Sequence, residues 1–157
     1  MKPSVYVETT IPSYLAARQS PQIVMAARQQ ITHEWWNDHR TNYNLFISQV
    51  VIDESADGDP EAAAKRMNLL RGIDILEPPT DADEIVSALM QRVPLPSNAA
   101  NDALHIAISV GNGIDYLLTW NCRHIANATL QARMEMVCDL FGFEMPTICT
   151  PEQLIEI

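Results

Sequence analysis

Short runs of β-branched and aromatic residues alternate with longer helical segments along the whole chain, and this alternation restricts the fold more than any other feature. Short strands separated by helices indicate a parallel sheet covered by helices, rather than separate blocks of helix and strand. The sequence therefore predicts an α/β fold. The predicted strands span residues 4–8, 43–47, 73–76, 116–119 and 147–148. The predicted helices open at residue 10 and span 21–39, 49–56, 60–71, 81–91, 98–110, 129–141 and 151–155.

The size of the chain limits the number of domains. It has 157 residues, of which 47% are hydrophobic, and this suits one domain with a sizeable core. We find no internal repeat, low-complexity segment or flexible linker that would divide it. We therefore expect a single domain over residues 1–157.

Charge and cysteine content restrict the partners and the compartment. Acidic residues outnumber basic ones 20 to 10, and a net charge of −10 repels nucleic acid and anionic membranes unless local groups attract them. Cys122, Cys138 and Cys149 are odd in number and lack the CxxC spacing of a zinc site, so we expect reduced thiols. Because we find no signal peptide and no apolar run of about 20 residues, we expect a soluble, cytoplasmic protein with no membrane partner.

An acidic residue, Asp102, lies near the start of an otherwise apolar helix that continues to Val110. Burying a carboxylate without a partner is costly, so such positions are usually occupied by ion pairs, hydrogen-bonded structural acids or metal ligands. His105 and Ser109 follow Asp102 at helical spacing, which places the three on one polar stripe. We expect this stripe to face a cleft.

Four polar side chains are expected to meet at one edge of the sheet. In open parallel sheets, ligands bind outside the carboxyl ends of the strands. Glu8 lies at that end of the first predicted strand, Asn121 follows the fourth, and Glu54 lies on the helix after the second. Asp102 enters from the helix before the fourth strand. Carboxylate oxygens suit Mg²⁺ or Mn²⁺, and three like charges without a cation would repel one another, so this set predicts a metal site.

The segments VYVETTIPSYL, FISQVVIDE, NDALHIAIS and DYLLTWNCRHI follow one another in the order and spacing of PIN-domain proteins. The chain resembles in particular the VapC-like toxins of type II toxin-antitoxin systems, and the resemblance covers nearly all of it. It implies a Rossmann-like three-layer sandwich with a short parallel sheet. The implied activity is hydrolysis of RNA phosphodiester bonds by a Mg²⁺- or Mn²⁺-dependent endoribonuclease, through a metal-activated water.

The same resemblance implies roles for individual residues. Three carboxylates would bind the metal ion, and one amide would place the attacking water or complete the shell. These catalytic residues are Glu8, Glu54, Asp102 and Asn121. Two threonine hydroxyls would orient the carboxylates, a histidine would support the cleft, and two basic side chains would contact the RNA phosphate. These residues are Thr9, Thr119, His105, Arg123 and His124.

Two positions depart from the family pattern. Glu8 stands where the family usually has Asp, so its carboxylate extends further from the backbone. Asn121 stands where Asp is frequent, and it brings a carbonyl oxygen without a charge, which weakens the case for a second metal ion. Asp115 is not its substitute, because a rise of roughly 3.3 Å per residue places Asp115 at the opposite end of the fourth strand.

Other interpretations of these residues stay open. Glu54 alone is typical of a surface acid on an amphipathic helix, and Glu8 or Asp102 could each stabilise a helix N-terminus. Trp35 and Trp36 could stack on bases, although paired aromatics on a long helix are more typical of a core or a dimer face. The chain could also be a catalytically weakened PIN-like interaction module, or a small-molecule phosphohydrolase, which Glu8 disfavours because those enzymes use an aspartyl nucleophile.

The resemblance implies partners as well. VapC-like proteins typically form homodimers, and a small antitoxin protein covers the cleft, often with an arginine that reaches the acidic residues. We therefore expect an RNA substrate, a cognate antitoxin and a homodimer. We expect the determinants of RNA specificity in residues 19–44.

Overall fold

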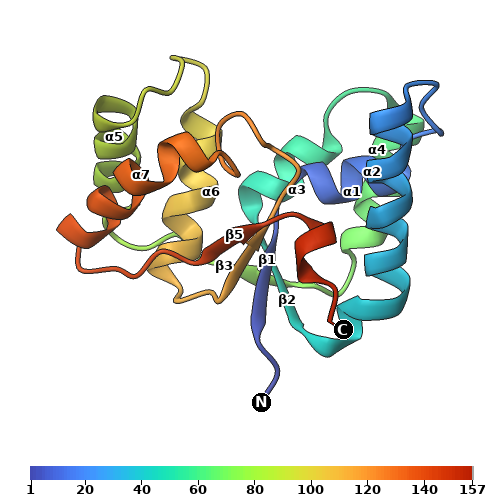
Figure 1. Ribbon diagram of the computed structural model, residues 1–157, viewed down its shortest axis with the longest axis horizontal. Coiled ribbons are helices and arrows are strands. Elements are labelled where there is room, and N and C mark those ends of the chain that lie inside the picture. Colours follow the sequence, from blue (N-terminus) through green and yellow to red (C-terminus); the bar gives the residue numbers. More distant parts are fainter. Residues whose placement is uncertain (157) are drawn as a thin grey trace.

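The computed structural model describes residues 1–156, and within them five short strands form one sheet in the order β3-β2-β1-β4-β5 (Figure 1). All four pairings are parallel, so the predicted α/β fold with a parallel sheet is confirmed. The strands are β1 (Ser4–Val7), β2 (Asn44–Ser48), β3 (Asp74–Leu76), β4 (Tyr116–Leu118) and β5 (Thr147–Cys149).

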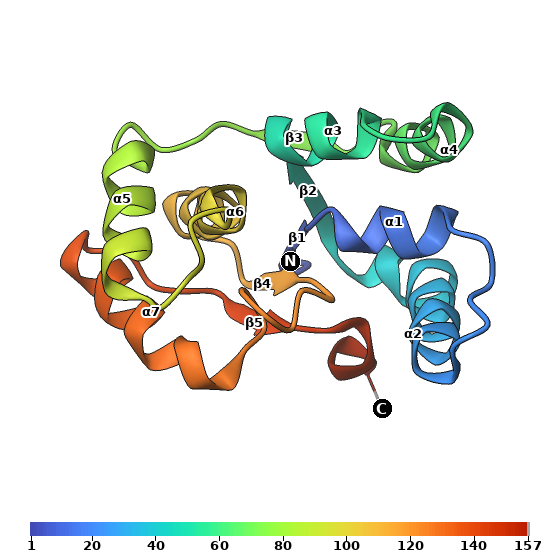
Figure 2. The same ribbon diagram turned by 90° about the horizontal axis from the view of Figure 1, so that it is seen from above.

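Helices cover both faces of the sheet. Figure 2, which looks onto the edge where the strands end, shows α5, α6 and α7 on one side and α1, α2 and α4 on the other, with α3 beyond β2 and β3. The helices are α1 (Thr10–Ala16), α2 (Ile23–Glu34), α3 (Gln49–Ala56), α4 (Pro60–Leu70), α5 (Ala82–Arg92), α6 (Ala100–Gly111) and α7 (Ala128–Leu140). A short 3-10 helix, Pro151–Leu154, follows β5. No helix in residues 1–156 is long and apolar enough to cross a membrane.

The central strands are buried on both faces, which explains their nearly continuous apolar sequence. Val5, Tyr6 and Val7 of β1, and Leu117 and Leu118 of β4, have no exposed surface. Each aliphatic side chain of this kind contributes about 1.5–3 kcal/mol by leaving water. The core therefore fixes β1 and β4 side by side in the middle of the sheet.

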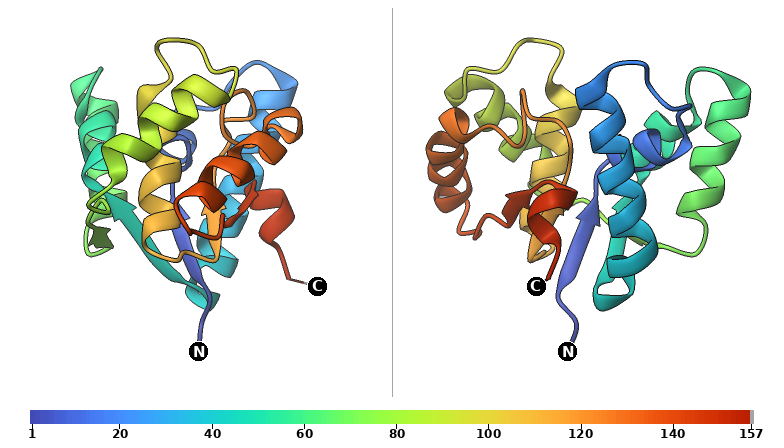
Figure 3. Two further views of the ribbon diagram at one scale, coloured as in Figure 1. Left: turned by 90° about the vertical axis from the view of Figure 1, so that its left-hand side faces the viewer. Right: turned by 45° about the vertical axis from the view of Figure 1, so that its right-hand side comes forward.

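The strand order reverses between β1 and β4. From β1 the chain adds β2 and β3 on one side, then returns to place β4 and β5 on the other. A crevice forms at such a switch point, outside the carboxyl ends of the two strands. Figure 3 shows the N-terminus at the opposite end of the sheet from the carboxyl ends of β1 and β4. Residues directly after β1 and β4 are therefore well placed to form a site.

The helix predicted over 21–39 changes form at its end. α2 stops at Glu34, and a π-helical turn, Trp35–His39, continues the chain. This turn buries Trp35 and Trp36, and the Trp35 Nε1–H group donates a hydrogen bond to the Leu154 carbonyl oxygen at 3.0 Å. The core interpretation of this aromatic pair is therefore confirmed, and base stacking by it is excluded because the rings are buried.

The cysteines are free, as expected. Cys122 is exposed, whereas Cys138 and Cys149 are buried. Burial raises the pKa of Cys138 to about 11 and that of Cys149 to about 12, so both remain neutral thiols at physiological pH.

Candidate metal centre

Glu8 follows the last residue of β1, and its carboxylate lies at the switch point of the sheet. The side chain is 3% exposed. Its Oε1 atom accepts hydrogen bonds from the Thr119 hydroxyl at 2.6 Å, the Thr10 hydroxyl at 2.5 Å and the Thr10 backbone N–H at 3.1 Å. These bonds replace the water that the carboxylate loses on burial. Among the described residues, no hydrogen bond to Oε2 is formed, so that oxygen is available to a ligand.

Glu54 lies on α3, the helix that follows β2, and its side chain reaches the same region as Glu8. Its Oε1 atom accepts hydrogen bonds from the Thr9 hydroxyl at 2.6 Å and from His105 Nε2 at 2.7 Å. Burial alone would raise the pKa of Glu54, but the bonds from His105 and Thr9, with a smaller contribution from Asn101, lower it below its usual value. The carboxylate is therefore charged at neutral pH, and neither of the two short bonds occupies Oε2.

His105 lies on α6 with no exposed surface, and both of its ring nitrogens have partners. Nε2 contacts Glu54, and Nδ1 lies 2.6 Å from the Tyr6 hydroxyl, which in turn lies 2.7 Å from the Ser48 hydroxyl. Burial raises the pKa of Tyr6 far above its usual value, so the phenol stays neutral. Ser48 holds the N-cap position of α3, yet its side chain bonds to Tyr6 rather than to the helix.

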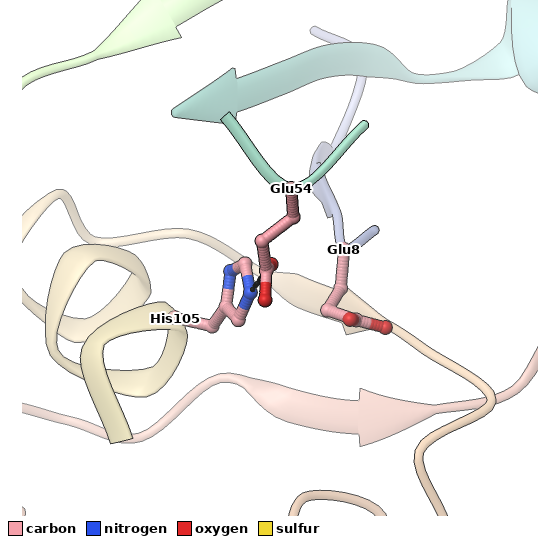
Figure 4. A group of neighbouring side chains, drawn as sticks. All are labelled: Glu8, Glu54 and His105. Atoms are coloured by element: carbon pink, nitrogen blue, oxygen red, sulfur yellow. Dashed lines mark hydrogen bonds and ion pairs between the residues drawn. The ribbon is translucent and has the colours of Figure 1, made fainter. Parts of the chain in front are cut away.

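Glu8, Glu54 and His105 form a compact group of potential metal ligands. Each offers one ligand atom, and the three atoms lie within 4.8 Å of one another. Figure 4 shows the Glu54 side chain between His105 and Glu8. Two carboxylates with an oxygen each to spare fit a hard divalent cation such as Mg²⁺ or Mn²⁺. The donor set present is therefore compatible with the metal ion that the sequence predicted.

Asp102 lies in the first turn of α6, next to this group but outside it. Its Oδ2 atom is 2.8 Å from Nδ1 of His124, and both side chains are largely but not fully buried. Asp102 precedes His105 by three residues, so the two share a face of the helix. The structure thus brings Glu8 and Glu54 together as predicted, and pairs the third predicted carboxylate with a histidine. Metal coordination by Asp102 stays a prediction.

Asn121 shapes the turn between β4 and α7. The Asn121 side-chain oxygen accepts a hydrogen bond from the His124 backbone N–H at 3.0 Å. The Asn121 backbone N–H donates to the Thr119 hydroxyl at 2.9 Å. The side-chain oxygen thus uses one of its two lone pairs within the turn, which holds His124 against Asp102. A catalytic role of Asn121 stays a prediction. Arg123, in the same turn, is exposed to solvent.

Thr9 and Thr119, which were predicted to orient the carboxylates, contact Glu54 and Glu8 respectively. Asp115 lies at the other end of the sheet, where its Oδ2 accepts hydrogen bonds from the Ser4 backbone N–H at 2.8 Å and the Ser4 hydroxyl at 3.0 Å. The expectation that Asp115 is remote from the site is confirmed.

Sequence reasoning missed Tyr6, Ser48 and Thr10. Tyr6 precedes Glu8 by two residues, so the period of a strand places both on one face of β1, and this spacing could have identified it. Thr10 was predicted only to open a helix. Its hydroxyl also accepts a hydrogen bond from the Trp120 backbone N–H at 2.8 Å, a contact between distant segments that local sequence does not reveal.

A groove of about 620 Å³ is lined by α2, by the segment that follows β4 and by residues of α7, β5 and the final 3-10 helix. Trp120 lines it directly after Thr119, and the Arg28 guanidinium lies 5.1 Å from the centroid of the Trp120 ring. Ile23 and Val24 border the groove with 86% and 66% of their surface exposed. The groove therefore combines a cation stacked on an aromatic ring with an exposed apolar rim.

Comparisons with known proteins agree with this architecture. No family model matches the chain, and no curated protein matches it in sequence. Among solved structures, the chain is similar to the crystal structure of VapBC2 from Rickettsia felis bound to a DNA fragment from their promoter. The similarity covers 94% of this chain and 98% of that chain, with a TM-score of 0.57 and 14% sequence identity. An identity this low shows the fold alone, and the predicted PIN-like three-layer sandwich is confirmed.

Proposed function

We propose that the protein is a metal-dependent endoribonuclease that hydrolyses RNA phosphodiester bonds, and that it is the toxin of a toxin-antitoxin pair. One observation carries the proposal. Glu8 and Glu54, which are 46 residues apart, meet at the switch point of a PIN-like sheet, and threonine and histidine side chains hold one oxygen of each. This arrangement orders two carboxylates while leaving an oxygen of each for a cation.

Electrostatic repulsion favours a bound cation at this position. Two unit negative charges no more than 4.8 Å apart repel by at least about 3 kcal/mol at an effective dielectric constant of about 20. Burial and hydrogen bonds keep Glu8 and Glu54 in place despite this repulsion. We propose that Glu8 and Glu54 hold Mg²⁺ or Mn²⁺, with Asp102 as a third carboxylate at the margin of the site.

The residues of the chain then have distinct tasks. Thr10 and Thr119 hold Glu8, while Thr9 and His105 hold Glu54. When bound, a divalent cation supplies positive charge that lowers the pKa of water and offsets the charge of the transition state.

The substrate phosphate would be bound from the other side of the site. Asn121 orients the turn in which His124 pairs with Asp102, and the partly exposed His124 ring would contact a phosphate oxygen. Arg123, exposed in the same turn, supplies local positive charge for binding RNA to a protein whose net charge is −10.

The activity can be tested with a panel of structured and single-stranded RNAs. We expect the wild-type protein to cleave RNA with Mn²⁺ or Mg²⁺ and not with a chelator present. Glu8→Gln, which keeps the size of the side chain and removes its charge, should lower the rate by about 100-fold or more. Asp115→Asn, at the opposite end of the sheet, is the matched control and should cleave as the wild type does. Undiminished cleavage by Glu8→Gln would refute the proposed site.

We also propose a cognate antitoxin and a homodimer as partners. VapBC2 from Rickettsia felis, the similar solved structure, is described as bound to promoter DNA. The exposed Ile23 and Val24 beside the groove offer an apolar surface for a protein chain, and an arginine of that chain could pair with the acidic site. Co-purification with the product of a neighbouring short reading frame, and light scattering of the protein alone, test the two partners separately.

A catalytically weakened interaction module is the second candidate. The observation in its favour is Asn121, which brings no charge and whose side-chain oxygen is used within the turn. Calorimetry with Mn²⁺ distinguishes the two. Metal binding together with cleavage supports the nuclease, whereas a protein that binds no metal ion and cleaves no RNA supports the module.

A further inference from the structure

We propose that Ser48, Tyr6 and His105 form a hydrogen-bonded positioning chain for Glu54, and that His105 acts through Glu54 rather than as a metal ligand. This inference rests on the proposed metal site. It assigns Glu8 and Glu54 as ligands of the cation, and His105 as a residue that positions Glu54 without binding the cation.

The direction of the chain follows from the chemistry of its members. Oε1 of Glu54 accepts from the Thr9 hydroxyl at 2.6 Å, and a carboxylate oxygen without a proton can only accept, so the 2.7 Å contact requires a proton on His105 Nε2. In the tautomer that we propose, which carries a proton on Nε2 alone, Nδ1 accepts, and the Tyr6 hydroxyl donates to it across 2.6 Å. The Tyr6 oxygen then accepts from the Ser48 hydroxyl at 2.7 Å. In this order Ser48 donates to Tyr6, Tyr6 donates to His105, and His105 donates to Glu54.

The chain is built from elements that the core already fixes. Ser48 ends β2, Tyr6 lies within β1, and His105 lies on α6, and none of the three has exposed surface. In so dry an environment hydrogen bonds are stronger than in water, and an unpaired group would be costly. Residues on β2, β1 and α6, whose backbones are fixed by the core, therefore determine the position of one carboxylate oxygen, Oε1 of Glu54.

The chain has a consequence for the choice of cation. Coordination by His105 Nε2 would require loss of the proton that this nitrogen donates to Glu54. With the proton retained, the site offers oxygen ligands alone, which favours Mg²⁺ and Mn²⁺, whereas a histidine ligand would favour Zn²⁺. His105 is therefore a positioning residue, comparable to the outer residues that orient ligands around known metal ions.

The protonation pattern can be measured without a metal ion. In the full-length protein labelled with ¹⁵N, long-range ¹H–¹⁵N spectra distinguish a protonated Nε2 from an unprotonated one. We expect His105 to carry its proton on Nε2, and to keep it when Mg²⁺ is added. Tyr6→Phe removes the donor to Nδ1 and should shift the Nδ1 resonance. A proton found on Nδ1, or one lost from Nε2 on addition of Mg²⁺, would overturn the proposal.

Metal affinity gives the second measurement. His105→Leu removes the donor to Glu54 and should weaken Mn²⁺ binding about 10- to 100-fold in calorimetry. His105→Gln, whose amide can still donate from a position close to Nε2, should recover most of the affinity. Ser109→Ala, one turn further along the same buried face of α6, is the matched control, because the Ser109 hydroxyl bonds only to the His105 backbone carbonyl.

The results separate this inference from the proposed function. If the wild-type protein binds no Mn²⁺, the metal site itself fails, while the spectra still test the chain. If the wild type binds Mn²⁺ and His105→Leu binds it equally well, the chain has no positioning role. If His105→Gln is as weak as His105→Leu while circular dichroism shows both folded, His105 is a ligand and the proposal is wrong.

Discussion

The Thr119 hydroxyl joins the end of β4 to the proposed site, and replacing it with the isosteric Val should be costly. In the folded protein this buried hydroxyl donates to the Glu8 carboxylate at 2.6 Å and accepts from the Asn121 N–H at 2.9 Å. A hydrogen bond to a charged group contributes about 1.5–3 kcal/mol and a neutral one about 0.5–1.5 kcal/mol. Thr119→Val should therefore lower the free energy of unfolding by about 2–4 kcal/mol.

Urea titration followed by circular dichroism measures this loss directly. For a domain of this size, the expected loss in the free energy of unfolding corresponds to a fall in Tm of roughly 6–12 °C. Thr147→Val is the matched control, since Thr147 lies exposed on the neighbouring strand β5 and its replacement should change stability by less than about 0.5 kcal/mol. A Thr119→Val protein as stable as the control would refute the argument that hydrogen bonds hold Glu8 in place.

Two further predictions concern pH and packing. Because the pKa of Glu54 is lowered from 4.5 in the folded state, its charged form stabilises the fold above that pH, and this contribution is lost as the pH falls below it. Urea unfolding between pH 6 and pH 3, a range of about three units around the ordinary carboxyl pKa, should show a smaller loss of stability in Glu54→Gln than in the wild type, and an equal loss would contradict the assignment. Gly111→Ala should destabilise the protein by about 1–3 kcal/mol, because an added Cβ would lie 2.4 Å from Cγ of Pro79. Thermal unfolding tests this, and an unchanged Tm would show that the two segments can separate without cost.

Much of the fold could be predicted because its local signals agree with its tertiary structure. The run 4–8 became β1 almost unchanged, since its apolar residues fill a central strand that is buried on both faces. The segment after Ser48 became α3, which carries Glu54 to the carboxyl edge as expected. The switch-point rule then identified Glu8 and Glu54 correctly as neighbours, because it depends on strand order rather than on side-chain detail.

The detail of the site could not be predicted, because it depends on contacts between distant segments. The β4–α7 turn places His124 against Asp102, and the sequence did not reveal this contact because the geometry of that turn depends on Asn121. Ser48 holds the N-cap position of α3, where serine commonly caps a helix, yet the buried Tyr6 hydroxyl competes for its side chain. A sequence pattern indicates the face of a helix or strand on which a residue lies, but it does not identify the hydrogen-bond partner of that residue.

The central claim is that Glu8 and Glu54 share one divalent cation, and a crystal structure of the protein soaked with Mn²⁺ tests it most directly. The account predicts an anomalous difference peak about 2.1 Å from an oxygen of each carboxylate, with His105 Nε2 still bonded to Glu54. A peak bound to neither carboxylate, or none at saturating Mn²⁺, would contradict it.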